Sequence, residues 1–432
     1  MFNIQDEKVQ KLLFEGNFGL EKESLRVDED GFLSKSAHPF GNNEHIVRDF
    51  CENQTEINTG VSDSADGAVK ELEGYTKEIH EVLSSLEKPE LLWPFSNPPY
   101  IRNEDDIPIA SFKGVETSKT EYRQFLADRY GRYKMTFSGI HVNFSFGDEL
   151  LKEDFKLSGK KDFKEYKNEV YLTVAEQAAA YCWLLVAITA ASPLMDGSYV
   201  EKKAYDEDEF SGMASVRSSE LGYWNAFTPI FDYSNIENYA KSIQAYVDNG
   251  MLSAPSELYY PIRLKPRGKN NLEKLRNEGV DHIELRMFDL NPLEKAGLDV
   301  RDVKFAHLMM IWLASKERQK FEPKDQVQAV QHFKNAAHYD LKTVKIYTPD
   351  GEAYELADAA LRVIKFMREF FEKYPNDKYY PEDVDNIFSF EEQKFIDAEN
   401  RYAWQIRKKF SGGYVKKGLE LARHLREEYL NV

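Results

Sequence analysis

The sequence predicts an α+β protein in which helices surround an antiparallel sheet. Strand-like and helix-like stretches do not alternate as β–α–β units, the pattern that a parallel sheet requires. The first extended stretch, residues 17–27, is followed by Asp28-Glu29-Asp30-Gly31, whose Asp-Gly step is typical of a tight reversal between antiparallel strands. Hydrophobic residues make up 42% and aromatic residues 13% of the 432-residue chain, which is enough for a large core.

Helices are expected where apolar residues recur at helical spacing, and where capping residues such as Ser62-Asp63-Ser64 precede them. The predicted helices cover residues 4–15, 65–87, 120–130, 161–191, 236–248 and 299–316, and most of the chain after about 325. The apolar run near Trp183 is too short to span a bilayer, so we expect a buried helix there and no membrane partner.

Strands are expected where short stretches rich in β-formers alternate between apolar and polar residues. They cover residues 17–27, 54–59, 133–146, 257–264 and 282–289. The stretch from Pro89 to Pro108 contains several prolines and is predicted to be irregular. We place a core region at residues 1–320 and a mainly helical extension, packed on it, at residues 321–432.

The composition excludes several classes of function. A net charge of −17 and a pI of about 5.2 argue against a nucleic-acid binder, which needs a basic face. Two cysteines, Cys51 and Cys182, cannot form a disulfide framework or a thiolate zinc set, and their small number fits a reducing cytoplasm. The first seven residues lack the basic and apolar regions of a signal peptide, so we expect a cytoplasmic protein.

Glu21 and Glu23 lie two residues apart on the first predicted strand and therefore share a face. Neighbouring carboxylates repel each other unless a cation or a proton lies between them, and an oxygen-rich pair is what Mg²⁺ prefers. A single Glu-Lys-Glu is more often a solvated strand face. The interpretation as a metal site therefore depends on the other strands.

Three later strands repeat the pattern. On each, polar side chains face away from an apolar set such as Ile140, Val142 and Phe144. The polar residues are Glu56 with Asp49 upstream, His141 with Asn143, and Glu284 with Arg286. Carboxylates with one imidazole and an amide suit Mg²⁺ or Mn²⁺. A lone His141 would more often be a structural histidine, but four such strands indicate one shared cavity.

Cationic residues lie on or near the same elements. Arginine beside metal-binding carboxylates is the arrangement that phosphoryl transfer needs, although any one of these residues could instead have a surface or ion-pair role. The residues are Arg123, Arg217, Arg263, Lys265, Arg267 and Arg286. No phosphate-binding loop of the Gly-x-x-x-x-Gly-Lys-Ser/Thr or Gly-x-Gly-x-x-Gly type occurs, so metals and the sheet face would have to hold a nucleotide.

These stretches, taken in order, resemble the motifs of bacterial glutamate–cysteine ligases. The similarity covers about residues 15–315 and is greatest to the ligase part of the Gram-positive bifunctional glutathione-synthesising enzymes. The motifs begin with Gly19-Leu20-Glu21-Lys22-Glu23-Ser24-Leu25-Arg26-Val27 and continue through Asp49 to Glu56, Trp93-Pro94, Tyr122-Arg123, Ser138 to Ser145, Ser215-Val216-Arg217, Leu221-Gly222-Tyr223, Glu257 to Arg263, Ile283 to Arg286 and Asp289 to Pro292.

The resemblance implies a glutamine-synthetase-like fold, with an antiparallel sheet curved into a funnel. It implies ATP-dependent phosphorylation of the glutamate γ-carboxylate, attack by the cysteine amine and loss of phosphate, the first step of glutathione biosynthesis. Two or three Mg²⁺ ions, or Mn²⁺, would be held by Glu21, Glu23, Asp49, Glu56, His141, Asn143 and Glu284. Arg286 and Arg123 would contact the transferring phosphoryl group, Arg263 and Lys265 the nucleotide, and Arg217, Tyr223 and Tyr259 the amino acids.

Alternatives remain at this point. Trp224-Asn225-Ala226-Phe227 departs from the motif expected after Tyr223, so a ligase with the same chemistry and another amine acceptor is the second hypothesis. A non-catalytic nucleotide-binding relative is the third, and the complete carboxylate set argues against it. At 432 residues the chain has no room for an ATP-grasp half, so we expect a stand-alone first-step enzyme. Whether it is a monomer or a homodimer stays open.

Overall fold

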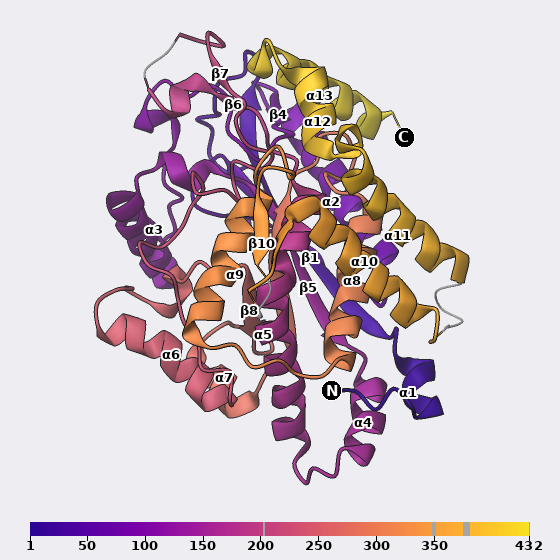
Figure 1. Cartoon of the computed structure of the whole chain (residues 1–432). Helices are drawn as coiled ribbons and strands as arrows, with labels where there is room; N and C mark the ends of the chain where they lie inside the picture. The colour runs from indigo at the N-terminus through magenta and orange to yellow at the C-terminus, as the bar shows by residue number, and fades with distance from the viewer. Residues whose placement is uncertain (202–203, 348–350, 375–380, 432) are drawn as a thin grey trace.

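The computed structural model describes residues 1–201, 204–347, 351–374 and 381–431. Its centre is a seven-stranded sheet with the order β2–β3–β1–β5–β9–β8, in which β4 pairs with the far end of β1 (Figure 1). Each of these strands pairs antiparallel with its neighbours, and the sheet is not closed into a barrel. The predicted α+β class is therefore confirmed.

The longest strand, β1, lies in the middle of the sheet and ends where Asp28 turns the chain. The Asp28 carboxylate accepts the Phe32 N–H at 2.9 Å, and Gly31 takes the left-handed φ of 87° that the turn requires. The sheet is built from β1 (Gly16–Asp28), β2 (Ile46–Arg48), β3 (Gln54–Asn58), β4 (Glu90–Leu92), β5 (Gly139–Phe146), β8 (Ile262–Lys265) and β9 (His282–Asp289). Two small hairpins are β6 (Met195–Asp196) with β7 (Glu209–Phe210), and β10 (Lys345–Tyr347) with β11 (Ala353–Glu355).

The two faces of the sheet have different chemistry. The core face carries buried apolar side chains, because Leu20, Val142 and Leu285 are opposite one another on β1, β5 and β9. The residues between them, such as Glu21, His141 and Glu284, therefore project to the other side, which we call the site face. The predicted alternation on β5 and β9 is confirmed.

Helices cover the core face. Helix α5 packs against β8, β9 and α8, while α2 packs against β1 (Figure 1). The helices are α1 (Glu7–Leu12), α2 (Ala65–Ser85), α3 (Thr117–Tyr130), α4 (Asp148–Leu157), α5 (Phe163–Thr189), α6 (Ile236–Asp248), α7 (Leu272–Glu278), α8 (Val300–Ser315), α9 (Pro323–Ala336), α10 (Leu356–Phe371), α11 (Pro381–Ile396), α12 (Tyr402–Phe410) and α13 (Tyr414–Leu430).

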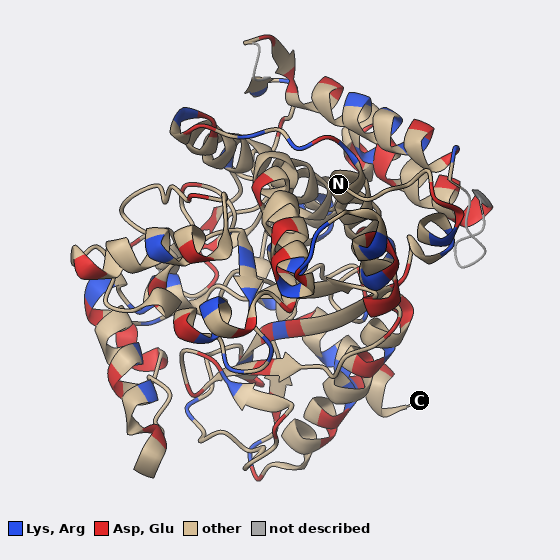
Figure 2. Ribbon diagram, turned by 90° about the horizontal axis from the view of Figure 1, so that it is seen from below, with Lys and Arg blue, Asp and Glu red and all other residues tan. Residues whose placement is uncertain are grey.

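Helix α5 is, among the described residues, the one helix long and apolar enough to cross a membrane, but 89% of its most apolar window is buried inside the fold. Burial against the sheet and two helices explains its composition, as the sequence predicts. Polar residues lie on the outer helices, where acidic and basic segments are interspersed (Figure 2).

The C-terminal helices are attached to the core by an ion cluster that we call the anchor cluster: Asp302, Glu391, Lys394 and Tyr402. Lys394 on α11 lies 2.8 Å from Asp302 on α8 and 2.7 Å from Glu391. It also donates to the carbonyl oxygen of Ile188, near the end of α5, at 3.1 Å. All of these groups are at least 95% buried, so α11 contacts the two central helices through a closed polar network.

Some predicted elements are wrong in detail. The region 89–108 is not wholly irregular, because Glu90–Leu92 forms β4 against β1. The strand predicted from residue 133 begins at Gly139, after a 3-10 turn over Tyr133–Thr136. The strand predicted from residue 257 begins at Ile262, because Pro255–Glu257 is a 3-10 turn. In each case tertiary pairing decides where an apolar stretch becomes a strand.

Candidate functional site

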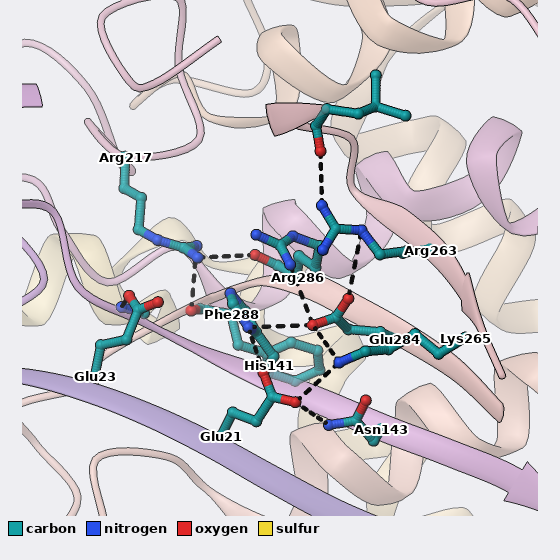
Figure 3. A network of polar contacts seen from close by, with 12 residues as sticks. Glu21, Glu23, His141, Asn143, Arg217, Arg263, Lys265, Glu284, Arg286 and Phe288 are labelled. Atoms are coloured by element: carbon teal, nitrogen blue, oxygen red, sulfur yellow. Dashed lines mark hydrogen bonds and ion pairs between the residues drawn. The ribbon is translucent and has the colours of Figure 1, made fainter. Parts of the chain in front are cut away.

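The site face brings the predicted ligands of three strands together (Figure 3). His141 Nδ1 lies 3.0 Å from Glu21 Oε2 and 3.4 Å from Glu284 Oε1, and Asn143 donates to Glu21 Oε1 at 3.0 Å. The registers explain this contact, because Glu21 is opposite His141 and Asn143 is opposite Glu284. Ligand atoms of Glu21, His141 and Glu284 all lie within 4.8 Å of one another, close enough to share one ion.

A bulge shapes this part of the sheet. Ile140 pairs with Phe288 and Val142 with Leu285, so His141 is opposite two residues of β9, Arg286 and Met287. A bulge bends a strand and changes the direction of its side chains, and it often occurs next to an active site. Here it directs Arg286 to the site face, where its Nη1 donates to Glu284 Oε1 at 3.1 Å.

Three cationic side chains surround Glu284. Lys265 Nζ lies 3.3 Å from Glu284 Oε1 and 3.2 Å from Glu21 Oε1, so it bridges the two carboxylates. Arg263 Nε lies 3.8 Å from Glu284 Oε2, and its Nη2 donates to the Leu258 carbonyl oxygen at 2.6 Å. Together with Arg286 they form the cation-rich edge of the site that the sequence predicts.

The charges set the protonation states of the cluster. Burial alone would raise the pKa of Glu21, but the His141 hydrogen bond and the Lys265 charge outweigh it and lower the pKa to about 2. Burial, together with the Arg286 charge, lowers the pKa of His141. The carboxylate is therefore ionised and the imidazole is neutral at pH 7, which are the forms that bind metal ions.

A second carboxylate group lies beside the first. Glu23 on β1 is directly opposite Glu56 on β3, and the Gly139 N–H donates to Glu23 Oε2 at 3.0 Å. Burial, followed by the charge of Asp49, raises the pKa of Glu23 to about 8 and raises the pKa of Glu56 well above its usual value. These three acids repel one another, and a divalent cation among them would remove that repulsion.

The residues fit hard divalent cations. The donors are carboxylates, one neutral imidazole and one amide, with no thiolate, which suits Mg²⁺ or Mn²⁺. The Asn143 side-chain oxygen is buried and has no hydrogen-bond partner among the described residues, so it has a free acceptor. The excess of acids at Glu23, Glu56 and Asp49 also favours a cation.

Arg217 reaches the site from a loop. Its guanidinium donates to the carbonyl oxygens of Arg286 at 2.9 Å and Phe288 at 3.4 Å, next to the bulge. A Cβ atom at Gly139 would lie 2.2 Å from Arg217 Cζ, so glycine makes room for this guanidinium. Gly139 is a site residue that the sequence reasoning missed, although it lies inside a quoted motif.

An aromatic group borders Arg286. The Arg286 guanidinium lies 5.5 Å from the centre of the Tyr259 ring. The Tyr259 ring meets the rings of Tyr223 and Trp224 edge-to-face, with ring centres 5.1 and 5.4 Å apart. Asn225 accepts the Tyr259 N–H at 2.8 Å and holds this segment in place. The predicted pair Tyr223 and Tyr259 is thus brought together, and the unexpected Trp224 packs directly against it.

Arg123 lies apart from the Glu284 cluster. On α3, its guanidinium donates to the carbonyl oxygens of Asp49 and Lys119 and lies 4.8 Å from the Phe112 ring centre. It is therefore near the Asp49 end of the site, and its predicted contact with a phosphoryl group stays a prediction. Burial raises the pKa values of the Cys51 and Cys182 thiols, so neither is an activated nucleophile.

Comparison with known proteins identifies consistent relatives. A family model for glutamate-cysteine ligase matches residues 1–251 and 228–336. The glutathione biosynthesis bifunctional protein GshAB of Listeria welshimeri is 34% identical over 441 aligned residues, which cover 98% of this chain and 56% of that protein. The glutamate–cysteine ligase of Clostridium acetobutylicum is 30% identical over 442 aligned residues, which cover 89% of this chain and 90% of that protein.

Two solved structures share the fold over nearly the whole chain. A bifunctional glutathione synthetase from Pasteurella multocida has a TM-score of 0.85 at 25% identity and covers 99% of this chain and 54% of its own. A glutamate–cysteine ligase from Francisella tularensis, solved in complex with AMP, has a TM-score of 0.84 at 25% identity. The match covers 97% of this chain and 89% of that protein. The chain spans about half the length of the bifunctional relatives that it matches.

Proposed function

This chain belongs to the glutamate–cysteine ligase family, and from that premise we propose that it joins the γ-carboxylate of L-glutamate to the amine of L-cysteine with ATP as co-substrate. The product would be γ-glutamylcysteine, the first intermediate of glutathione biosynthesis. The observation that carries the proposal is the cluster of Glu21, His141 and Glu284 beside Arg286, Arg263 and Lys265. Acids that can hold divalent cations, next to cationic side chains, are what phosphoryl transfer needs.

Divalent cations would be held by two adjoining sets of ligands. Glu21, His141 and Glu284 form the first, with Asn143 in contact, and Asp49, Glu23 and Glu56 form the second. Bound Mg²⁺ or Mn²⁺ would neutralise the phosphate oxygens of ATP. The AMP bound to the relative from Francisella tularensis supports an adenine nucleotide as ligand.

The chain's own residues would then orient the reactants. Arg286 and Arg263 would bind the γ-phosphate while a glutamate γ-carboxylate oxygen attacks phosphorus and ADP leaves. The cysteine amine would attack the acyl carbon of γ-glutamyl phosphate, expelling phosphate and releasing a proton. Arg217, Tyr223 and Tyr259 would contact the amino acids, and Lys265 the nucleotide, after leaving the carboxylates that it bridges. Arg123 would act from the Asp49 end.

We further propose that residues 1–320 form the catalytic core and that residues 321–432 are an extension of it. The contacts of α9 with α5, and of α11 with α8, support this arrangement. A cytoplasmic location is proposed because both cysteines are free and buried, as expected in a reducing compartment.

The experiment that tests the function is phosphate release from ATP with Mg²⁺ and glutamate, with cysteine present, absent or replaced by 2-aminobutyrate or alanine. We expect cysteine-dependent release, equal amounts of ADP and phosphate, and a γ-glutamylcysteine product. Trp224 packs against Tyr259, an observation that favours a second candidate: a γ-glutamyl ligase with another acceptor. Faster release with another amine would support that candidate, and no release with any amine would contradict both.

A further inference from the structure

A cavity of about 380 Å³ lies on the core side of the sheet, away from the site face. It is bounded by α5, α8, α9 and α10 and by the β10–β11 hairpin, which lie together in the front of Figure 1. Helix α5 separates it from β8 and β9, which carry Arg263 and Glu284 on their opposite face. Its volume is within the range of small-molecule sites, and the proposed ligase reaction does not use it.

The inner wall of the cavity is aromatic. Trp183 on α5 and Trp312 on α8 line it and are only 3% and 7% exposed. Tyr181 meets Trp312 edge-to-face with ring centres 5.3 Å apart, and Tyr354 lines the wall formed by the hairpin. Flat rings on several sides favour a planar ligand, because aromatic pairs in contact add stabilisation beyond their buried area.

Two cations in the cavity rest on these rings, and neither is paired with an acid of the described residues. Lys316 Nζ lies 4.4 Å from the Trp312 ring centre and 3.0 Å from the Tyr181 hydroxyl, while Arg362 Cζ lies 4.3 Å from the Tyr354 ring centre. Neither forms an ion pair within 4.0 Å with any carboxylate of the described residues. Their positive charge is therefore available to a ligand.

The two acids that also line the cavity have other contacts. Asp325 accepts the Glu322 N–H at 2.9 Å and completes the capping box of α9. Glu352 accepts the hydroxyl of Tyr354. Neither of these two contacts is made with Lys316 or Arg362, so both cations can still pair with an anion.

We propose that this cavity binds a small aromatic carboxylate. The ring would lie among Trp183, Trp312 and Tyr354, and the carboxylate would pair with Lys316, with the more exposed Arg362 at the rim. Lys316 and Arg362 share the cavity with two acids, Asp325 and Glu352, so it suits a singly charged carboxylate better than a doubly charged phosphate. The proposal does not depend on the proposed ligase activity, because the two sites lie on opposite faces of the sheet.

The test is isothermal titration calorimetry of the full chain with three probes. Indole-3-acetate carries both the ring and the charge, indole-3-ethanol lacks the charge, and cyclohexaneacetate lacks the aromatic ring. We expect indole-3-acetate to bind at least tenfold more tightly than either of the others. Lys316→Gln should weaken its binding about tenfold, since the ammonium group that lies against the Trp312 ring would form the ion pair with the carboxylate. Arg362→Gln should weaken it a few-fold.

The matched control is Lys324→Gln, an exposed lysine of α9 that does not line the cavity. Its affinity for indole-3-acetate should equal that of the wild type. Equal binding of indole-3-acetate and indole-3-ethanol, or no measurable binding of indole-3-acetate, would overturn the proposal. So would tighter, Lys316-dependent binding of AMP, which would assign the cavity to a phosphate. Trp312→Phe, which keeps a ring, should retain binding, whereas Trp312→Leu should lose it.

Discussion

The molecule contains two buried charge clusters of opposite design. The site cluster gathers Glu21, His141 and Glu284 with three cations on one face of the sheet, and the side chains of Glu21, Lys265 and Arg286 remain 14–18% exposed. The anchor cluster encloses Lys394 and Asp302 between helices with side chains 1% and 3% exposed. Charges that keep contact with solvent can exchange partners for a ligand, whereas enclosed charges can only stabilise the fold.

The two clusters also differ in the protonation of their carboxylates. Burial raises the pKa values of both Asp302 and Glu391, and one lysine lies between them, so the anchor cluster holds one ionised carboxylate and one extra proton. In the site cluster three cations keep the pKa of Glu284 well below its usual value despite burial. The site cluster therefore keeps ionised carboxylates that can exchange their present partners for a metal ion, and the anchor cluster is already neutral.

Glu284→Gln should have the largest effect of the changes that test the difference between the two clusters. The change keeps the shape and removes a proposed metal ligand, so we expect turnover to fall more than about a thousandfold, because metal stabilisation of the transferring group is worth several kcal/mol. The free energy of unfolding should also fall, because Arg263, Lys265 and Arg286 lose their buried carboxylate, but by less than for a change in the anchor cluster, since these cations keep some contact with solvent. Product formation and urea denaturation measure the two effects. Glu149→Gln, on the exposed surface of α4, is the control.

Lys394→Met, in the anchor cluster, should have the reverse effect: a large loss of stability with little change in turnover. Removing the ammonium leaves the one ionised carboxylate of the cluster buried without its cation, which should lower the free energy of unfolding by about 3–5 kcal/mol. Turnover per folded molecule should stay near that of the wild type. Adding Glu391→Gln should recover part of the stability. A turnover loss as large as that of Glu284→Gln would show that the two clusters do not differ in the way described.

Removing metal tests the site cluster alone. Chelation by EDTA should abolish activity, and Mg²⁺ at about a hundredfold excess over its Kd should raise the free energy of unfolding by about 2.7 kcal/mol per site. In Glu21→Gln this gain should shrink while Lys394→Met keeps it. Thermal denaturation against Mg²⁺ concentration is the measurement. Equal Mg²⁺ stabilisation in wild type and Glu21→Gln would place the cation elsewhere.

Gly139→Ala should have the smallest effect. The new Cβ would displace the Arg217 guanidinium, so the KM for glutamate should rise about tenfold. That rise corresponds to a loss of about 1.4 kcal/mol in the binding free energy of glutamate. The KM for ATP should be unchanged. Steady-state kinetics with each substrate varied in turn distinguishes the two. If the KM values for ATP and glutamate rise equally, Arg217 positions the bulge rather than the amino acid.

Much of this architecture could be predicted from the sequence. The strand at 282–289 and the face of each residue on it follow from alternation, and the family inferred from the motifs is confirmed. The bulge could not be predicted, because it depends on the pairing of two strands that lie more than a hundred residues apart. The position of Arg123 at the Asp49 end, the space at Gly139 and the aromatic cavity likewise arise from tertiary packing. The hairpin β10–β11 was missed because the surrounding sequence is helical and charged.

The order of strands along the chain has a consequence for synthesis. Glu21 is made early on β1, but its partner on β9, Glu284, comes 263 positions later. At about 10 residues per second on the ribosome, that interval is roughly half a minute. During this time β1 carries two carboxylates that have no place in an apolar core, and a one-residue slip in its pairing would bury both. Glu21 and Glu23, which are proposed metal ligands in the folded protein, would thus also disfavour a shifted pairing of β1 during synthesis.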